Sequence, residues 1–319
     1  MSDALIESLP TDVELEFAAP SESLVFQPMD IYPKDATIGN GITVEDIGGD
    51  STASGVVGRG GTDASLRVSA EAWDGEVPPC TEGRVDERTT LPDGTVVDTL
   101  DAVSEYDGVS THHRTAIAYF ADTLVSARTT SEGEDSALPL EVDELRDIVS
   151  NPELRVSAQV PDGTPPPRHD CRSSRENPVP PLSKDVVERL GAALADQWAI
   201  SFPAARTDRP IGDLVPGSYG SGSACNRVNV ETPAGTTELT VEISVEENTE
   251  VSDSPGVSGT TPPDGTVVTG WTDEFASGDQ PSERLRVLRP SNTVVQFGFG
   301  DGIDVDSLVD LASAPGLDL

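Results

Sequence analysis

The hydrophobic positions of this chain follow two patterns, and the first is the strict alternation typical of half-buried strands. Apolar residues occupy every second position in Ser65–Trp73 and again in Leu239–Val245, which predicts a strand in each place. Two further stretches, Thr115–Arg128 and Arg284–Phe299, alternate on both sides of a short turn and predict hairpins. Antiparallel sheet is therefore expected in both halves of the chain.

The second pattern is helical spacing. The segment "VDELRDIV" from Val142 and the segment "VDSLVDLA" from Val305 each place their apolar residues on one helical face. A proline soon follows each segment, and proline cannot continue a helix. Helices are also predicted at Asp3–Leu9 and Lys184–Ala195, the second with Ser183 as its N-terminal cap.

Each opening helix is followed by a stretch that alternates again. These stretches predict strands at Val13–Phe17 and Trp198–Phe202. An irregular stretch rich in Gly and Ser comes next in both halves and is left without a predicted element.

The two halves match each other in the same order. "PDGTVV" occurs at Pro92–Val97 and at Pro263–Val268, and "VDELRDIVSNPEL" shares Val, Asp, Leu, Asp, Ser, Pro and Leu with "VDSLVDLASAPGL". Collinear matches of this kind predict a tandem duplication. Residues 161–183 are rich in proline and are expected to form an extended linker. The predicted domains are therefore copy one at 1–160, the linker at 161–183, and copy two at 184–319.

These elements define the expected fold class. We predict an α+β fold made of two tandem copies, each an antiparallel sheet of about five strands flanked by an N-terminal and a C-terminal helix. The length of 319 residues is sufficient for two domains that each bury a core.

Charge narrows the range of partners. The chain has 57 acidic and 20 basic residues and a formal net charge of −37. Nucleic acid is not expected as a partner, because a binding surface for it must neutralise phosphates with clustered cations. The acidic residues are spread along the chain, as in solvated surfaces that maintain solubility.

Cysteines and targeting signals add further expectations. Cys80, Cys171 and Cys225 are the three cysteines, and their spacing leaves open one disulfide with a free thiol or three thiols. The sequence has no apolar run of membrane-spanning length and no visible signal peptide. We expect either a cytoplasmic protein or an ectodomain without its membrane anchor.

Several segments together resemble a known group of proteins. "CTEGRVDERTTLPDGTVV" and "LPLEVDELRDIVSNPEL" in the first half, with "TPPDGTVV" and "IDVDSLVDLASAPGL" in the second, look like extracytoplasmic domains of certain actinobacterial membrane-anchored proteins. The resemblance implies a location outside the cytoplasm, an antiparallel α+β fold and a non-enzymatic role. The chain departs from that pattern at Cys80, where a close pair of cysteines is expected.

Two groups of residues could bind a metal or perform catalysis. His112 and His113 are adjacent and could ligate a metal with a third ligand from elsewhere, but their segment is predicted to be a solvent-exposed loop. His169, Asp170 and Cys171 have suitable side chains, but consecutive residues in a proline-rich linker cannot converge as a catalytic triad does.

Three further features of the sequence bear on ligand binding. Asp301, Asp304 and Asp306 have close spacing for calcium, but they do not follow an EF-hand pattern. The Gly-rich segment at 217–226 lacks the ending of a phosphate-binding loop and is expected to be a mobile loop. The tryptophans are Trp73, Trp198 and Trp271, of which Trp198 is expected in the core and Trp271 at its rim.

The sequence therefore assigns no catalytic, cofactor-binding or metal-ligating residue, and no cofactor is expected. The leading prediction is a non-enzymatic extracytoplasmic binding or sensing module whose partner is a protein or a cell-envelope ligand. One alternative is a structural or cytoplasmic protein of a salt-adapted organism. The other is a hydrolase that uses Asp and Glu in a cleft between the two copies.

Overall fold

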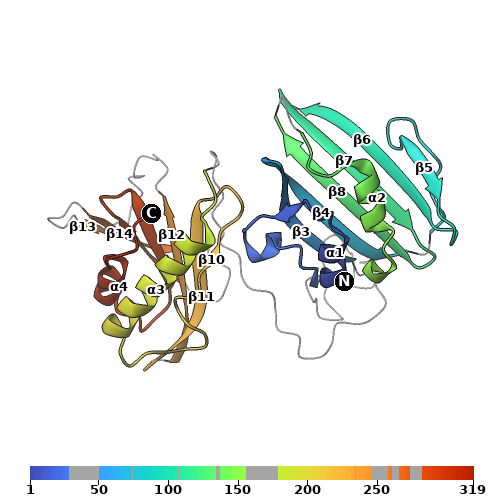
Figure 1. Cartoon of the computed structure of the whole chain (residues 1–319). Coiled ribbons are helices and arrows are strands. Elements are labelled where there is room, and N and C mark those ends of the chain that lie inside the picture. The colour runs from blue at the N-terminus through green and yellow to red at the C-terminus, as the bar shows by residue number, and fades with distance from the viewer. Residues whose placement is uncertain are drawn as a thin grey trace. The chain divides into compact units, whose positions relative to one another are not determined.

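The computed structural model describes residues 1–28, 50–73, 75–106, 108–133, 137–155, 179–233, 235–245, 258–260, 266–273 and 282–319. The chain divides into two compact units. The first takes most residues up to Arg168, and the second takes most residues from His169 onward. Each unit is described by itself below (Figure 1).

The first unit is built mainly from antiparallel strands. Its elements are α1 (Ser2–Ser8), β1 (Glu14–Leu15), η1 (Pro20–Glu22), β2 (Gln27–Pro28), β3 (Asp50–Arg59), β4 (Thr62–Ala72), β5 (Glu87–Thr90), β6 (Val96–Tyr106), β7 (Val109–Tyr119), β8 (Thr123–Glu132), α2 (Val142–Val149) and η3 (Pro152–Leu154). The strand order is β1-β3-β4-β8-β7-β6-β5, and β2 pairs with β3 beside β1.

The second unit has a sheet of the same connectivity. Its elements are α3 (Lys184–Ser201), β9 (Arg206–Thr207), β10 (Val215–Pro216), β11 (Ser223–Thr232), β12 (Gly235–Val245), β13 (Ser258–Thr260), β14 (Val267–Asp273), β15 (Ser282–Leu288), β16 (Thr293–Phe299) and α4 (Val305–Ala312). The strand order is β10-β11-β12-β16-β15-β14-β13, and β9 pairs with β11. The central strands of the two units therefore correspond one to one.

The predicted fold class is wrong. The molecule is mostly antiparallel sheet, with 43% strand and 20% helix, rather than a helix-flanked α+β fold. Each sheet has eight strands, seven of them in one continuous order, where about five were expected. The missing strands include β3, whose Gly and Ser content hid the alternation, and β11, which begins within the Gly-rich segment 217–226.

Strand β3 shows why small residues suit this sheet. The side chain of Leu24 lies over Gly55, where a Cβ atom would stand 2.7 Å from the Leu24 Cγ atom. Leu24 is fully buried, so an adjacent segment supplies the apolar group that β3 itself lacks. A sequence pattern cannot reveal this arrangement, because the group that fills the space lies on another element.

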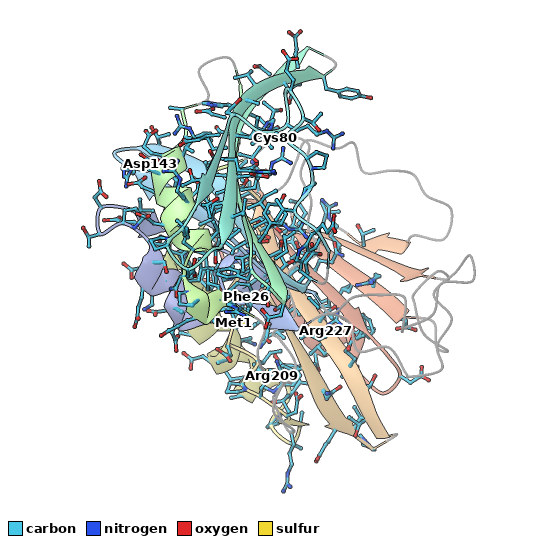
Figure 2. The ribbon with its side chains drawn as sticks, turned by 90° about the vertical axis from the view of Figure 1, so that its right-hand side faces the viewer. Met1, Phe26, Cys80, Asp143, Arg209 and Arg227 are labelled. Atoms are coloured by element: carbon cyan, nitrogen blue, oxygen red, sulfur yellow. The ribbon has the colours of Figure 1, made fainter. Side chains whose placement is uncertain are left out.

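The core of each unit lies between one face of the sheet and the helices. In the first unit, α2 packs on β6, β7 and β8, and α1 packs on α2 (Figure 1). In the second unit, α4 packs on β15, β16 and α3. The buried residues of these layers form one apolar cluster per unit. Figure 2 shows α2, which begins beside the labelled Asp143, against one side of the first sheet.

The helix predictions were partly right. Helices α2 and α4 begin at the predicted Val142 and Val305, and the Ser183 hydroxyl accepts a hydrogen bond from the Val186 amide as the cap of α3. The predicted strand at Trp198–Phe202 is wrong, because α3 continues to Ser201. The Trp198 ring is buried and stacks on Phe202 with centroids 4.2 Å apart, whereas Ile200, the apolar residue between them, is exposed.

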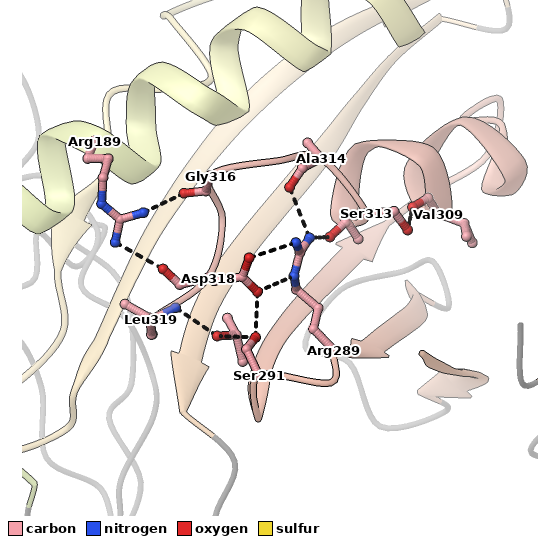
Figure 3. A network of polar contacts seen from close by, with 11 residues as sticks. Arg189, Arg289, Ser291, Val309, Ser313, Ala314, Gly316, Asp318 and Leu319 are labelled. Atoms are coloured by element: carbon pink, nitrogen blue, oxygen red, sulfur yellow. Dashed lines mark hydrogen bonds and ion pairs between the residues drawn. The ribbon is translucent and has the colours of Figure 1, made fainter. Parts of the chain in front are cut away.

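The C-terminal tail of the second unit is fastened to the turn between β15 and β16. The Arg289 guanidinium donates to both carboxylate oxygens of Asp318, at 2.8 and 3.1 Å, and to the carbonyls of Ala312 and Ala314. Arg189 of α3 donates to the Gly316 and Asp318 carbonyls. Figure 3 shows these contacts converging on the tail.

The tail of the first unit is also held to a turn by an ion pair. Here the tail supplies the arginine and the turn supplies the carboxylate. Arg155 of the tail pairs with Asp122 of the turn between β7 and β8, and its guanidinium lies 5.1 Å from the centre of the Phe120 ring.

In the part of the chain that the structure describes, no helix is long and apolar enough to cross a membrane.

Candidate functional site on the helix-free face of the first sheet

The face of the first sheet that points away from α1 and α2 is called the open face below. Strand β4 defines it, because Ala64, Leu66, Val68 and Ala70 are buried while the alternate residues are not. Successive side chains of a strand point to opposite faces. Strand β4 therefore presents a polar series to the open face, consisting of Asp63, Ser65, Arg67, Ser69 and Glu71.

Two arginines stand side by side at the centre of this face. Arg67 of β4 is the register partner of Arg128 of β8, and both side chains are exposed. Residues directly opposite on neighbouring strands have Cβ atoms about 5 Å apart, and like charges in that position destabilise the sheet. The arginine pair therefore reduces the stability of the folded sheet.

No acidic residue in the described part of the chain compensates this pair. Neither guanidinium makes a hydrogen bond or ion pair with the residues that the structure describes. On β4 the nearest open-face acids, Asp63 and Glu71, are each four residues from Arg67, about 14 Å along a strand. Asp98 of β6 shares the face but is held by Arg88 at 2.6 Å.

Small hydroxyl side chains border the arginine pair on both sides. Ser69 and Ser126 are register partners with their oxygens 2.8 Å apart. Ser65 and Thr130 are register partners on the other side. Hydroxyls can donate to an anion or accept from a cation, so the surroundings of the arginines are polar and uncharged.

His113 of β7 adds an imidazole to the same face. It is the register partner of Thr130, next to the row that contains Arg128. Its Nδ1 atom is buried and has no hydrogen-bond partner among the described residues. Burial lowers the pKa of His113 below its usual range, and the charges of Arg128 and His112 lower it further. The ring is therefore held toward its neutral form, and its Nδ1 atom is enclosed by protein atoms.

The second unit has no such pair at the same place in its sheet. The equivalent register partners, on β12 and β16, are Thr240 and Gly298. Arginines occur on the strands to either side instead: Arg227 pairs with Glu238 at 3.6 Å, and the Arg284 guanidinium covers Gly298. Arg227 is labelled in Figure 2. At this register the second unit thus has no opposed arginines, and its Arg227 has an acidic partner.

The structure corrects the prediction for His112 and His113. Both lie within strand β7 rather than in a loop, and both are half-buried. Strand alternation sends them to opposite faces, so they cannot ligate one metal ion together. His112 lies on the helix side, where its Nε2 atom is 2.6 Å from Asp101, a carboxylate that also accepts from Arg114.

Two of the aspartates that follow β16 lie at the start of helix α4. Asp304 caps α4 by accepting hydrogen bonds from the amide and hydroxyl of Ser307, which lower the pKa of Asp304. Asp306 lies in the first turn of α4, as predicted, and Asp301 is exposed in the preceding turn. In the described ranges no group of three or more His, Cys, Asp or Glu is arranged to hold a metal.

The Gly-rich segment at 217–226 is not a loop throughout. Its second part forms the start of β11, and the Gly217 amide donates to the Ser223 carbonyl at 2.7 Å. The Val179 amide also donates to the Gly220 carbonyl, so the chain that enters α3 lies along this segment. His169, Asp170 and Cys171 lie outside the described residues.

The structure also describes two of the three cysteines and the ring of Trp73. Cys225 is disulfide-bonded, whereas Cys80 is a free, exposed thiol. Trp73 is half-buried, with its ring 5.7 Å from that of Tyr119. The side chain of Trp271 is outside the described part of the chain.

One pair of carboxylates also lies close together on the first sheet. A Cβ atom on Gly58 would stand 2.6 Å from an Asp63 oxygen and 2.7 Å from a Glu16 oxygen. Burial raises the pKa of Glu16, and the negative charges of Asp63 and Glu14 raise it further. Asp63 is exposed, so these carboxylates are not enclosed as an acid–base pair in a cleft would be.

The sequence did not indicate the arginine pair. Each arginine stands at a polar position of an alternating strand, where a charged residue is ordinary. Only the register of β4 against β8 brings the two together, and register depends on pairing between residues distant in sequence. Comparison of the two halves of the sequence could have supplied a signal, because Arg67 and Arg128 align with Thr240 and Gly298.

No protein-family model matches the chain, and searches of curated proteins and of solved structures likewise find no match. The function is therefore inferred from the geometry of the molecule itself.

Proposed function

We propose that this chain is a non-enzymatic extracytoplasmic binding or sensing module, built by tandem duplication, that binds its ligand on the open face of the first unit. The observation that carries the proposal is the Arg67–Arg128 pair. A chain with a net charge of −37 has many carboxylates available to neutralise two exposed arginines, yet among the described residues none does so.

The other elements of the proposal have separate support. The identical order of the central strands in the two sheets favours a duplication. The disulfide at Cys225 favours an oxidising compartment, because disulfides persist outside the cytoplasm. The sequence resemblance to extracytoplasmic domains points the same way.

A thermal-unfolding screen of the full chain tests the binding function. Small anions, sulfated and uronate oligosaccharides, neutral oligosaccharides and peptides are each added at low ionic strength to the wild type and to the Arg67→Gln/Arg128→Gln double variant. A ligand that binds the folded state raises the unfolding midpoint. We expect one class to raise it in the wild type and not in the double variant.

Two results would contradict the proposal. One is that no class changes the midpoint of the wild type. The other is that every active class acts equally on the double variant, which would place the ligand elsewhere on the molecule.

A further inference from the structure

The arrangement of charges on the open face specifies the ligand more closely, and this step rests on the proposed function. We propose that the Arg67–Arg128 pair is a binding site for a phosphate-type oxyanion. The site comprises the two guanidiniums, the hydroxyls that border them and the imidazole of His113.

Charge balance is the first argument. The two guanidiniums carry two positive charges side by side, without an acidic partner among the described residues. A phosphate group carries about −1.5 to −2 at neutral pH and has at least three strong acceptor oxygens. One such group neutralises both arginines, whereas a single carboxylate supplies one charge and two oxygens, which one guanidinium can engage by itself.

Donor geometry is the second argument. Each guanidinium presents a planar fork of N–H donors that matches two oxygens of a phosphate. Ser69 and Ser126 border the pair on one side, and Ser65 and Thr130 border it on the other. His113 lies next to the row of Arg128 with its ring held toward the neutral form, so it adds no charge beside the pair.

The second unit supplies the third argument. At the same register its sheet has Thr240 and Gly298, and the neighbouring Arg227 is already paired with Glu238. We therefore expect one phosphate site per chain, on the first unit. Arg227 provides a matched control, because it is an arginine on the equivalent face of a sheet of the same order and has an acidic partner.

Isothermal titration of inorganic phosphate into the full chain tests the inference. The titration is done at pH 8, where phosphate is a dianion, and at low ionic strength, where surface charges are least screened. We expect one site in the wild type. Arg67→Gln and Arg128→Gln should each weaken binding about tenfold or more, as the loss of a charge-assisted hydrogen bond implies, and Arg227→Gln should leave it unchanged.

A conservative variant separates binding from structure. Arg128→Lys keeps the charge but not the fork, so it should bind less tightly than the wild type and more tightly than Arg128→Gln. Equal loss in both Arg128 variants, with an unchanged unfolding midpoint, would contradict a charge-based site.

The remaining outcomes distinguish this inference from the function on which it rests. If citrate or acetate binds at the arginine pair and phosphate does not, the phosphate inference is wrong while binding on the open face stands. If phosphate binds equally to wild type and to both Gln variants, or with two sites per chain, the assignment to this pair is wrong. If no anion binds the wild type, the phosphate inference is wrong, and the proposed function then depends on the neutral oligosaccharides and peptides of the unfolding screen.

Discussion

The arginines of the first sheet differ in whether they have acidic partners. On the helix side, Arg59 pairs with Glu144 at 2.8 Å and Arg114 pairs with Asp101 at 2.8 Å. On the open face Arg67 and Arg128 have no such partner among the described residues. Arg59 and Arg114 therefore stabilise the sheet through ion pairs, whereas Arg67 and Arg128 repel each other.

This difference predicts that the binding site reduces stability. Arg67→Thr installs the residue that the second unit has at this register, removes the like-charge pair and should increase the free energy of unfolding by about 0.5 kcal/mol at low salt. The gain should shrink as salt is added, because surface charges are screened. Chemical denaturation at two salt concentrations measures it.

Ser69→Thr, two residues along the same strand face, is the matched control. It changes a polar open-face residue without altering charge, so its effect should not depend on salt. A loss of stability in Arg67→Thr that is independent of salt would show that Arg67 is held by packing and not opposed by Arg128.

At the scale of elements, close backbone contact governs how α3 sits in the second unit. Gly191 lies in the middle of the helix, and a Cβ atom there would stand 2.1 Å from the Gly212 carbonyl oxygen. Helix propensity alone favours Ala over Gly by about 1 kcal/mol. The contact reverses this preference, because the neighbouring atom is backbone and cannot rotate away.

We therefore predict that Gly191→Ala destabilises the protein by about 2 kcal/mol, as overpacking does in other cores. Ala192→Gly, at the next and exposed position, should lower stability by only the helix-propensity difference of about 1 kcal/mol. Urea denaturation of both variants compares them. A stabilised Gly191→Ala protein would contradict the packing of α3 on this segment.

The contacts of Arg289 and Ser291 with Asp318, called the tail clasp here, predict that the stability of the protein depends on pH. Hydrogen bonds from Arg289 and then Ser291 lower the pKa of Asp318 below its usual value. A carboxyl with a lowered pKa stabilises the fold above its unfolded pKa of about 3.9, and this stabilisation is lost as pH falls through the lower folded value. The Asp318 side chain is 48% exposed, so solvent screening limits its contribution to less than about 1 kcal/mol.

Asp318→Asn should accordingly be less stable than the wild type at pH 7, and the difference should shrink as the pH falls through the lowered pKa of Asp318. Asp301→Asn, in an exposed turn of the same unit, serves as the control and should match the wild type throughout. A constant difference between Asp318→Asn and the wild type from pH 7 to pH 3 would mean that the charge of Asp318 has no role in the clasp.

Prediction from sequence succeeded for elements whose apolar residues contact the core directly. The helices at Val142 and Val305 and the strands around Leu66 and Val241 all expose a periodic apolar face to it. It failed where another segment supplies the packing, as Leu24 does over Gly55. It also missed the arginine pair, because the pairing register of β4 and β8 joins residues distant in sequence.

At the scale of the whole molecule, the cysteines test the proposed location. Cys225 is disulfide-bonded and Cys80 is free. The sequence has three cysteines. Alkylation of the denatured protein before reduction should modify one thiol, and intact mass should show three modified thiols after reduction. Three alkylated thiols without reduction would remove the support for an oxidising compartment.

The central claim is that the two opposed arginines of the first unit hold an anionic ligand, and the arginine side chains report on it directly. The measurement is a phosphate titration followed in ¹H–¹⁵N spectra of the arginine Nε–H groups, with signals assigned through the Arg67→Gln, Arg128→Gln and Arg227→Gln variants. The account predicts saturable shifts of the Arg67 and Arg128 signals at one common affinity, with the Arg227 signal unmoved. Unmoved Arg67 and Arg128 signals, or equal shifts at Arg227, would contradict it.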